Sequence, residues 1–370
     1  MAEGPRALRI ERIATHGFRN LEGLDVEPGP HFNVIHGENG AGKSNLLEAI
    51  YLLGTLRSFR NAKTDDVIAL GAGDAVLKMR VAAEHTSQVV AVALGRGRTR
   101  RVTLDGKRPK SAAVLRKRLP VVIFHPGHLS LSTGSAEIRR AYLDELLEPT
   151  APLYAEALAA YEKALRSRNR LLKEVEVDRR AVAPYDVLLA RHGAVIVEHR
   201  RALVTEIAPR IEAAFQQVVG DVLRLEARYA PRVEGDEGAI LRALEAAWPV
   251  DRARGFTADG PHLDDLELRF GEVGARHHAS QGQHRALALS MKIAELDYVA
   301  ERLGMVPILL LDDVSSELDR TRSRRLFERI SRLGGQVFLT TTHPEFILLE
   351  RDRVDFHVQG GVVTRDTSRA

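Results

Sequence analysis

The 370-residue sequence contains no Cys, which excludes disulfide bonds and thiolate metal sites. It also lacks long apolar runs: stretches such as VPILLL before Asp312 are far shorter than the roughly 20 residues that a membrane-spanning helix needs. The first residues, MAEGPRALRIERI, lack the apolar core of a secretory signal. We therefore expect a soluble, cytoplasmic protein with no membrane contact.

Aromatic residues and Lys are scarce as well. The chain has one Trp and seven Tyr, and of its 54 basic residues nine are Lys and 45 are Arg. A GC-rich genome would favour Arg everywhere, although Arg forks also suit phosphate and carboxylate groups. Clusters are therefore more informative than the total, and the densest are GRGRTRR at 95–101, KRPK at 107–110 and RKR at 116–118.

The apolar periodicity divides the chain into three parts. Residues 1–136 are β-rich and contain one glycine-rich loop, whereas residues 137–255 have helical periodicity. Residues 256–370 alternate strands with helices, which predicts a parallel sheet covered on both faces. The predicted fold is α/β: a P-loop ATPase head of the ABC type, assembled from both ends of the chain, with an inserted α-helical arm.

The predicted arm consists of strong helix formers with short breaks at Pro152, Pro184 and Gly235. Heptads are not sustained over three or more repeats, which would be needed for a long coiled coil. We therefore expect an antiparallel helical hairpin.

The segment GENGAGKS fits the pattern G-x-x-x-x-G-K-[ST] between an apolar strand and an amphipathic helix. Glycines allow backbone N–H groups to surround a polyphosphate, and the helix N-terminus adds partial positive charge. Lys43 is expected to reach the β- and γ-phosphates and Ser44 to bind Mg²⁺. The alternative is a degenerate, unused loop. The predicted nucleotide-binding residues are Gly37, Glu38, Asn39, Gly40, Ala41, Gly42, Lys43, Ser44 and Asn45.

The apolar strand ILLLDD at 308–313 predicts the second half of this site. It brings two carboxylates to the C-terminal edge of a parallel sheet, where ligands bind in such folds. Asp312 is expected to hold Mg²⁺, and Asp313 to orient or deprotonate the attacking water. A strand that ends in two acids is often only a solvated strand end, but the loop at Gly37 favours the functional interpretation.

Three further segments surround this strand in the sequence. SQGQHR at 280–285 opens a predicted helix, where small and amide side chains can donate to a phosphate or simply cap the helix. SSELD at 315–319 follows the acidic strand, and TTTH at 340–343 ends the next strand. A lone His after a strand, such as His343, usually has a structural role.

In this order the segments resemble those of the ATP-binding-cassette ATPases. The resemblance covers the loop at 37–44, the signature at 280–285, the acidic strand at 308–313, the D-loop at 315–319 and the switch histidine at 343. In that family two heads enclose two ATP molecules. The resemblance implies an ATP-dependent homodimer in which Ser280 and Gly282 contact the γ-phosphate in trans. It also places Gln283 and Asp319 at the nucleotide and gives His343 a catalytic role.

A longer set of motifs resembles the RecF family of bacterial recombination mediators. It comprises GFRN at 17–20, RSFRN at 57–61, FHP at 124–126, GSAEIRRAYLD at 134–144, GPHLDDLEL at 260–268, SQGQHR at 280–285 and LLLDDVSSELD at 309–319. The resemblance implies a weak ATPase that dimerises with ATP and binds duplex DNA near single-strand gaps. It also implies a role in replication and recombinational repair, in which RecR, and through it RecO, helps to load RecA.

Two positions depart from the family patterns. Gly127 follows Pro126 where the RecF family tends to carry an acid, and Asp313 stands where cassette ATPases usually have Glu. The shorter side chain of Asp313 should hold water farther away, so we expect slow turnover.

The basic clusters flank a predicted hairpin with a DG turn at Asp105 and Gly106. Arg-bearing strands can follow phosphates without reading bases, although a solvated hairpin is the alternative. No aromatic stacking platform is interleaved with these residues, which favours duplex over single-strand binding. The predicted DNA-binding residues are Arg96, Arg98, Arg100, Arg101, Lys107, Arg108 and Lys110.

Two other classes share this nucleotide machinery. A transporter's ATPase subunit would carry a much shorter insertion and an LSGGQ-like signature. A structural ATPase of the chromosome-maintenance type would extend its insertion as a long coiled coil. The insertion here, from about 137 to 250, is too long for the first class and too short and heptad-poor for the second.

Overall fold

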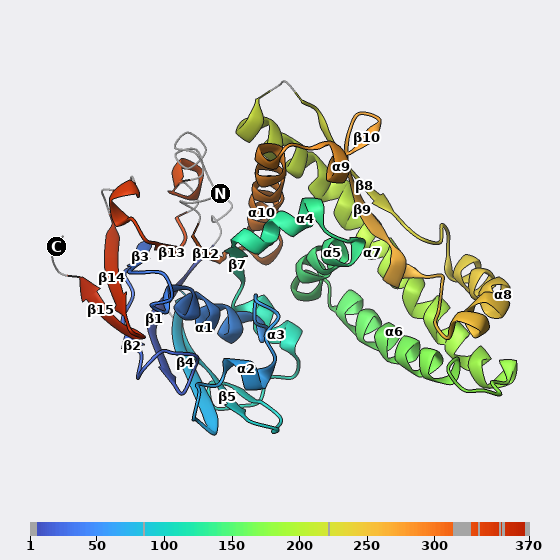
Figure 1. The fold of residues 1–370 in the computed structure, drawn as a ribbon, viewed down its shortest axis with the longest axis horizontal. Helices are drawn as coiled ribbons and strands as arrows, with labels where there is room; N and C mark the ends of the chain where they lie inside the picture. Colours follow the sequence, from blue (N-terminus) through green and yellow to red (C-terminus); the bar gives the residue numbers. More distant parts are fainter. Residues whose placement is uncertain are drawn as a thin grey trace. The chain divides into compact units, whose positions relative to one another are not determined.

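The computed structural model describes residues 6–83, 86–220, 223–313, 327–331, 334–347, 349 and 352–366. They form two compact units (Figure 1). The head unit comprises Met1–His128 and Glu295–Ala370, and the arm unit comprises Leu129–Ala294. The two ends of the chain therefore build one unit, as the sequence predicts.

Within the described residues, the head unit contains two six-stranded sheets. The first is mainly antiparallel, with the order β11-β1-β4-β5-β6 and β2 paired to β1. Its strands are β1 (Arg6–His16), β2 (Asp25–Val26), β4 (Asp74–Ala83), β5 (Thr86–Gly95), β6 (Arg101–Leu104) and β11 (Met305–Val306). The alternating burial of β4 and the positive φ angles of Asp105 and Gly106 confirm the predicted strand and turn.

The second sheet has the order β15-β14-β3-β13-β12-β7 and is parallel except for β15 at its edge. Its strands are β3 (Phe32–His36), β7 (Val121–Phe124), β12 (Ile308–Leu311), β13 (Val337–Thr341), β14 (Arg353–Gln359) and β15 (Val362–Asp366). All four residues of β12 are buried, which is typical of an inner parallel strand. The predicted parallel sheet is confirmed.

Helix α1 (Lys43–Thr55) packs against strands of both sheets. It is buried on every side from Leu46 to Gly54, as expected for a helix that is apolar around its whole circumference. Among the described residues, the head also contains the short helices α2 (Thr64–Val67), α3 (Ala112–Arg118), η1 (Pro126–Leu129) and η3 (Pro344–Phe346), the helical residues 327–331, and the end of α10 (Gln281–Leu303). The helix that follows the glycine-rich loop is therefore held rigidly by the core.

The arm unit is mainly helical, and α6 and α7 form the predicted hairpin. Its helices are α4 (Ser130–Thr133), α5 (Ala136–Thr150), α6 (Pro152–Leu171), α7 (Arg179–Val219), α8 (Glu237–Arg254), η2 (Pro261–Leu263), α9 (Ala275–His278) and the start of α10 (Gln281–Leu303). The predicted break at Pro184 is wrong, because Pro184 lies inside α7. A proline near a helix start removes only one intrahelical hydrogen bond, and packing against α6 maintains the helix.

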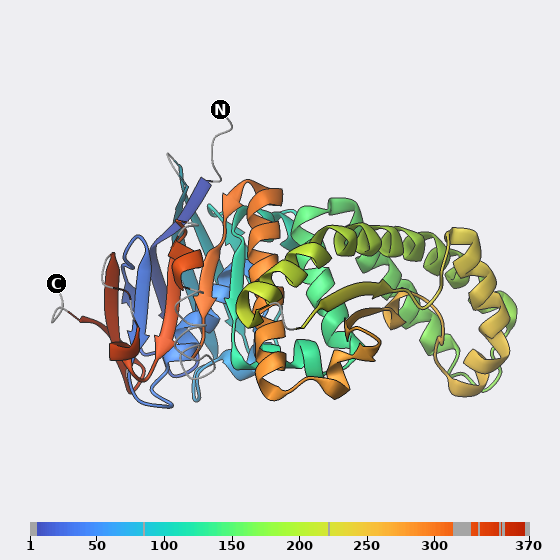
Figure 2. The same ribbon diagram turned by 90° about the horizontal axis from the view of Figure 1, so that it is seen from above.

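A small sheet in the arm unit was not predicted as a whole. It has the order β10-β9-β8, with β8 (Leu225–Ala230), β9 (Asp265–Phe270) and β10 (Val273–Gly274). Helix α7 packs along β8 (Figure 2). Strand β9 pairs with β8, and Arg139 donates two hydrogen bonds of 2.7 and 2.8 Å to Asp265 at the start of β9. These contacts explain why residues 256–294 group with the arm rather than with the predicted C-terminal part of the head.

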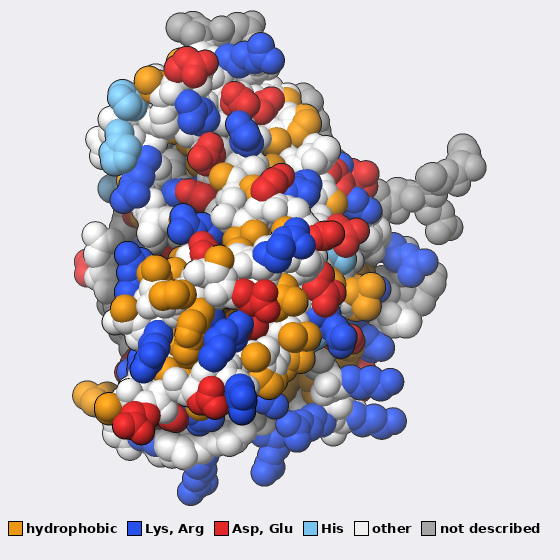
Figure 3. All heavy atoms as spheres, turned by 90° about the vertical axis from the view of Figure 1, so that its right-hand side faces the viewer, with side chains coloured by type: hydrophobic (Ala, Val, Ile, Leu, Met, Phe, Trp, Pro, Cys, Tyr) orange, Lys and Arg blue, Asp and Glu red, His pale blue; other side chains and the backbone are white. Residues whose placement is uncertain are grey.

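Among the described residues, no helix is both long and apolar enough to cross a membrane. Basic, acidic and hydrophobic side chains are interspersed over much of the face shown in Figure 3.

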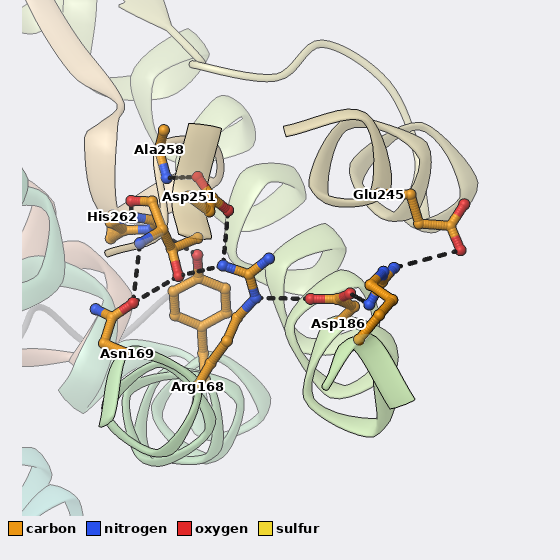
Figure 4. A network of polar contacts seen from close by, with 10 residues as sticks. Arg168, Asn169, Asp186, Glu245, Asp251, Ala258 and His262 are labelled. Carbon is orange, nitrogen blue, oxygen red and sulfur yellow. Dashed lines mark hydrogen bonds and ion pairs between the residues drawn. The ribbon is translucent and has the colours of Figure 1, made fainter. Parts of the chain in front are cut away.

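A buried ion cluster joins three arm helices (Figure 4). Arg168 of α6 donates from Nε to Oδ1 of Asp186 on α7 at 2.6 Å, and from Nη1 to Oδ2 of Asp251 on α8 at 2.7 Å. Nη1 also donates to Thr257 Oγ1 at 2.8 Å. The side chains of Arg168 and Asp251 have no exposed area, so each charge depends on its partner.

We expect Arg168→Met to lower the free energy of unfolding by about 3–5 kcal/mol, because it leaves Asp186 and Asp251 as buried carboxylates without this cation. Urea unfolding followed by circular dichroism measures the change. Arg166→Met is the matched control, since this side chain on the same helix is 70% exposed and pairs only at 3.5 Å with Glu162. The control should change stability by less than about 1 kcal/mol; equal effects would contradict the role of the cluster.

Candidate nucleotide-binding site

Parallel pairing gathers the predicted site residues of the head unit at one edge of the second sheet. Strand β13 lies between β3 and β12, and the residue pairs Thr341↔His36 and Leu311↔Leu339 align the three carboxyl ends. The glycine-rich loop leaves β3 at this edge, and the two acids follow β12. This edge is where ligands bind in parallel sheets.

Backbone conformation explains the glycines of the loop. Gly37 and Gly42 have φ angles of 150° and 118°, which side chains other than glycine rarely adopt. A Cβ atom on Gly37 would lie 2.2 Å from the carbonyl oxygen of Val358, and one on Gly42 would lie 2.8 Å from Oδ1 of Asn20. Only glycine at these two positions allows the loop to lie this close to its neighbours.

Lys43 opens α1 and points back into the loop. Its Nζ donates to the carbonyl oxygens of Gly37 and Glu38, both at 2.8 Å, and the residue is 9% exposed. Burial lowers the pKa of Lys43, and the carboxylates of Asp313 and Asp312 oppose this shift. The ammonium group is thus partly desolvated and held by carbonyl groups that a phosphate oxygen can replace.

Ser44 meets the acidic strand across 268 residues of sequence. Its Oγ donates to Oδ1 of Asp312 at 2.6 Å, and Thr340 Oγ1 donates to the same oxygen at 2.8 Å. The backbone N–H of Asp313 donates to Thr340 Oγ1 at 2.9 Å. Asp313 has a φ of 50° and is partly exposed, so its carboxylate follows a sharp turn directly after the strand.

The oxygen atoms of Ser44 and Asp312 fit Mg²⁺. This ion usually takes one or two protein oxygens and completes its shell with water and phosphate. Among the described residues, no group of three or more His, Cys, Asp or Glu that could hold a metal occurs.

Two other predicted nucleotide-site residues are His343 and Asp319. His343 follows β13, its backbone N–H donates to Thr341 Oγ1 at 3.0 Å, and its ring lies 3.0 Å from Oε1 of Glu345. The His343 side chain is 60% exposed, which leaves it accessible. Asp319 lies outside the described residues.

Ser280 caps α10 in the arm unit. Its Oγ accepts from the backbone N–H of Gln283 at 3.3 Å, while its own N–H donates to Oε1 of Gln283 at 2.7 Å. This reciprocal pair is a capping box. Both residues, with Gly282 between them, thus form the start of α10, and the role predicted for them in trans remains a prediction.

Two family motifs support the loop from outside, which the sequence did not indicate. Asn20, in GFRN, donates from Nδ2 to the carbonyl of Ala41 at 3.3 Å, and Asn45 Nδ2 donates to Asn20 Oδ1 at 2.7 Å. Arg60, in RSFRN, donates to Asn45 Oδ1 at 2.7 Å. These contacts join residues that are far apart in the sequence and so could not be predicted from it. The sequence showed only that the two family motifs were present.

Glu48 lies one turn after Ser44 on α1 and anchors both motifs. It is fully buried and accepts two hydrogen bonds from Arg19, at 2.8 and 2.9 Å, and one from Ser58 Oγ at 2.5 Å. Arg60 Nη1 lies 3.4 Å from Oε2 of Glu48. A buried carboxylate needs such partners, so the two motifs position α1.

The Gly127 position is close to the His125 side chain. A Cβ atom there would lie 2.6 Å from Cε1 and 2.8 Å from Nδ1 of His125, and the Gly127 N–H donates to His125 Nδ1 at 3.1 Å. The His125 ring thus occupies the space that a side chain at position 127 would need.

Strands β5 and β6 pair antiparallel and form a hairpin with its turn at 96–100, whereas the predicted turn at Asp105 and Gly106 closes only an isolated bridge between Leu104 and Lys107. The basic cluster at 95–101 lies in the β5–β6 turn, the cluster at 107–110 follows β6, and the cluster at 116–118 ends α3. Arg96 donates to four carbonyl oxygens, those of Ala72, Asp65, Ile68 and Ala69, at 3.0 to 3.4 Å, which gives it a structural role. Arg100 donates to the carbonyl of Leu56. The exposed members of the cluster are Arg96, Arg98, Arg100, Arg101, Lys107, Arg108 and Lys110.

Known proteins share this architecture. Residues 9–361 match the family described as RecF/RecN/SMC N terminal domain. The Smc head domain of Pyrococcus furiosus, solved with an extended coiled coil and bound to the C-terminal domain of ScpA, has a TM-score of 0.55 at 17% identity and covers 97% of this chain and 96% of that chain. The fold and the loop define the class: this is an ABC-type, SMC-like ATPase head.

The sequence relatives define the family. The DNA replication and repair protein RecF of Myxococcus xanthus (strain DK1622) is 37% identical over 369 residues, which cover 96% of this chain and 97% of the relative. A solved structure of the recombination mediator protein RecF-ATP in the RecFOR pathway has a TM-score of 0.88 at 28% identity, covering 98% of this chain and all of that chain. The chain belongs to the RecF family of recombination mediators in DNA replication and repair. The predicted fold class and family are confirmed.

Proposed function

We propose that this chain is an ATP-driven switch that closes as a homodimer on duplex DNA and opens when ATP is slowly hydrolysed. The observation that carries the proposal is the 2.6 Å contact between Ser44 and Asp312 beside Lys43, which is 9% exposed. In this proposal the contact joins two halves of a phosphate and metal site from distant parts of the sequence. The relative with a TM-score of 0.88 is described with ATP.

Each residue has a definite task in this proposal. Lys43 exchanges its two carbonyl partners for the β- and γ-phosphates, and the backbone N–H groups of residues 37–45 surround them. Ser44 and Asp312 would hold Mg²⁺, which neutralises phosphate charge when bound. Asp313 orients or deprotonates the attacking water, and its short side chain keeps turnover slow.

The second half of each ATP site comes from the partner subunit. Ser280 and Gly282 contact the γ-phosphate in trans, with Gln283 and Asp319 beside the nucleotide and His343 near the phosphate that leaves. Since these contacts require the γ-phosphate, ATP binding closes the dimer and hydrolysis releases it.

Molecular mass in solution tests the switch. Light scattering with ATP·Mg²⁺ should show a doubled mass, and a short gapped duplex should remain bound to the dimer. Ser280→Arg should bind ATP within about twofold of the wild type yet stay monomeric, because a bulky cation replaces the small residue of the trans contact. A mass that does not respond to ATP, or a tight dimer of Ser280→Arg, would contradict completion in trans.

Thr205→Arg is the control for the added charge, since Thr205 is exposed on α7 of the same unit. It should dimerise like the wild type. Because Ser280 caps α10, a thermal unfolding curve of Ser280→Arg must first show that the variant is folded; loss of a cap costs roughly 1 kcal/mol.

DNA is held through its phosphates in this proposal, without sequence preference. The basic hairpin and the residues that follow it carry this contact, chiefly through Arg98, Arg100, Arg101, Lys107, Arg108 and Lys110, since Arg96 is engaged with four carbonyl groups. Near single-strand gaps the clamp would work with RecR, and through it with RecO and RecA. A cytoplasmic location also remains a prediction, which cell fractionation tests.

A further inference from the structure

A pocket of about 360 Å³ opens in the head unit beside the end of α1. Its apolar wall includes Leu52 and Leu94. Its polar side chains come from the loop after α1, from α2 and from the hairpin turn: Arg57, Ser58, Asn61, Thr64 and Arg100. Two guanidinium groups and three small polar side chains therefore border one cavity.

The charged residues that line the pocket, among those described, are both basic: Arg57 and Arg100. The nearby carboxylates already have partners, since Asp65 and Asp66 accept from the backbone N–H groups of Gly97 and Lys63 and Glu48 accepts from Arg19. Burial lowers the pKa of Arg100, and the positive charge of Arg57 lowers it further. Two like charges close together are unfavourable, and an anion between them would remove this cost.

We propose that this pocket binds one phosphate group of a duplex DNA backbone between Arg57 and Arg100. The inference rests on the proposed function and adds a specific phosphate-binding site to it. Guanidinium forks bind phosphate oxygens in pairs, and the hydroxyl group of Thr64 can donate to a remaining oxygen, whereas the Ser58 hydroxyl already donates to Glu48. Arg98 in the hairpin turn and Arg101 at the start of β6 are exposed and lie within about 7 Å of chain from Arg100, so they can reach the neighbouring phosphates of one strand.

The choice of variants follows from the surroundings of the pocket. Ser58 and Arg60 bind Glu48 and Asn45 on α1, so changing them would disturb the nucleotide site. Arg57 and Arg100 are classed as exposed, but Arg100 also donates to the carbonyl of Leu56 at the end of α1, so a thermal unfolding curve must show that the double variant is folded.

The test is duplex affinity of the full chain with ATP·Mg²⁺, by fluorescence anisotropy over a range of salt concentrations. The double variant Arg57→Ala/Arg100→Ala should bind at least about tenfold more weakly and lower the salt slope by about 0.9, the value for one phosphate contact. ATP affinity should stay within twofold. The matched control Arg166→Ala/Arg201→Ala removes two exposed arginines from the arm, each paired with a Glu, and should bind DNA like the wild type.

Four results would overturn the assignment. They are unchanged DNA affinity in the double variant, an equal loss in the arm control, a parallel loss of ATP affinity, and loss of inorganic phosphate binding by calorimetry with DNA affinity intact. The last result would show that the pocket binds free phosphate and not the DNA backbone. If the wild type itself does not bind duplex DNA, the proposed function fails, whereas a wild type that binds and a double variant that binds equally well contradict only this pocket.

Discussion

Lys43→Ala is expected to weaken ATP·Mg²⁺ binding by about 10- to 100-fold. Lys43 is 9% exposed as a residue, and its ammonium group already points into the loop, where Gly37 and Glu38 hold it at 2.8 Å. A hydrogen bond to a charged group contributes roughly 1.5–3 kcal/mol, and 1.4 kcal/mol corresponds to a factor of ten. Isothermal titration with ATP·Mg²⁺ measures the loss. Dimerisation and DNA retention should fall together with ATP affinity.

Two further variants make this experiment specific. Lys43→Arg keeps the charge but replaces a compact ammonium with a wide planar fork, so it should not restore ATP affinity. Lys78→Ala removes an exposed lysine from β4 in the same unit and should bind ATP like the wild type. ATP affinity within twofold of the wild type in Lys43→Ala would show that the loop is not the nucleotide site.

Asp313→Asn is expected to lower ATP turnover by about 10²- to 10⁴-fold, the usual contribution of a positioned general base. Asn tolerates the left-handed conformation of this residue, whose φ is 50°, and the backbone bond to Thr340 does not involve the side chain. ATP binding should therefore survive, and the closed dimer should accumulate. Phosphate release and light scattering on the same samples measure the two effects.

Asp312→Asn is the neighbouring control. Asp312 accepts from Ser44 and Thr340, so this change should weaken Mg²⁺-dependent ATP binding as well as turnover, and the dimer should not accumulate. If Asp313→Asn and Asp312→Asn lose dimerisation equally, the division of tasks between the two carboxylates is wrong.

Local sequence was sufficient for the elements of the head. The loop pattern before Lys43 depends on backbone conformations that glycine alone adopts easily, and the apolar run before Asp312 is typical of a buried parallel strand. Both are properties of short segments. The prediction that the two segments meet followed from sheet topology, because carboxyl ends of parallel strands share one edge.

Elements that depend on distant partners were harder to predict. Strand β8 lies in a region of strong helix formers and forms because β9 pairs with it. Pro184 continues a helix that its own conformational preference would end, since the packing of α7 outweighs one lost hydrogen bond. Residues 256–294 belong to the arm unit because β9 pairs with β8 there, although the alternation of strands and helices in the sequence assigned them to the head.

The sequence by itself determined the family, the glycine-rich loop and the two acids, because each is written in consecutive residues with a local physical cause. Only the tertiary structure decided which side chains support them. Asn20 and Glu48 have no local signal, yet they hold the loop and α1 through bonds to residues up to 29 positions away. The pocket between Arg57 and Arg100 likewise exists only because folding brings a hairpin turn beside the end of α1. The two positive charges that meet there favour the binding of an anion.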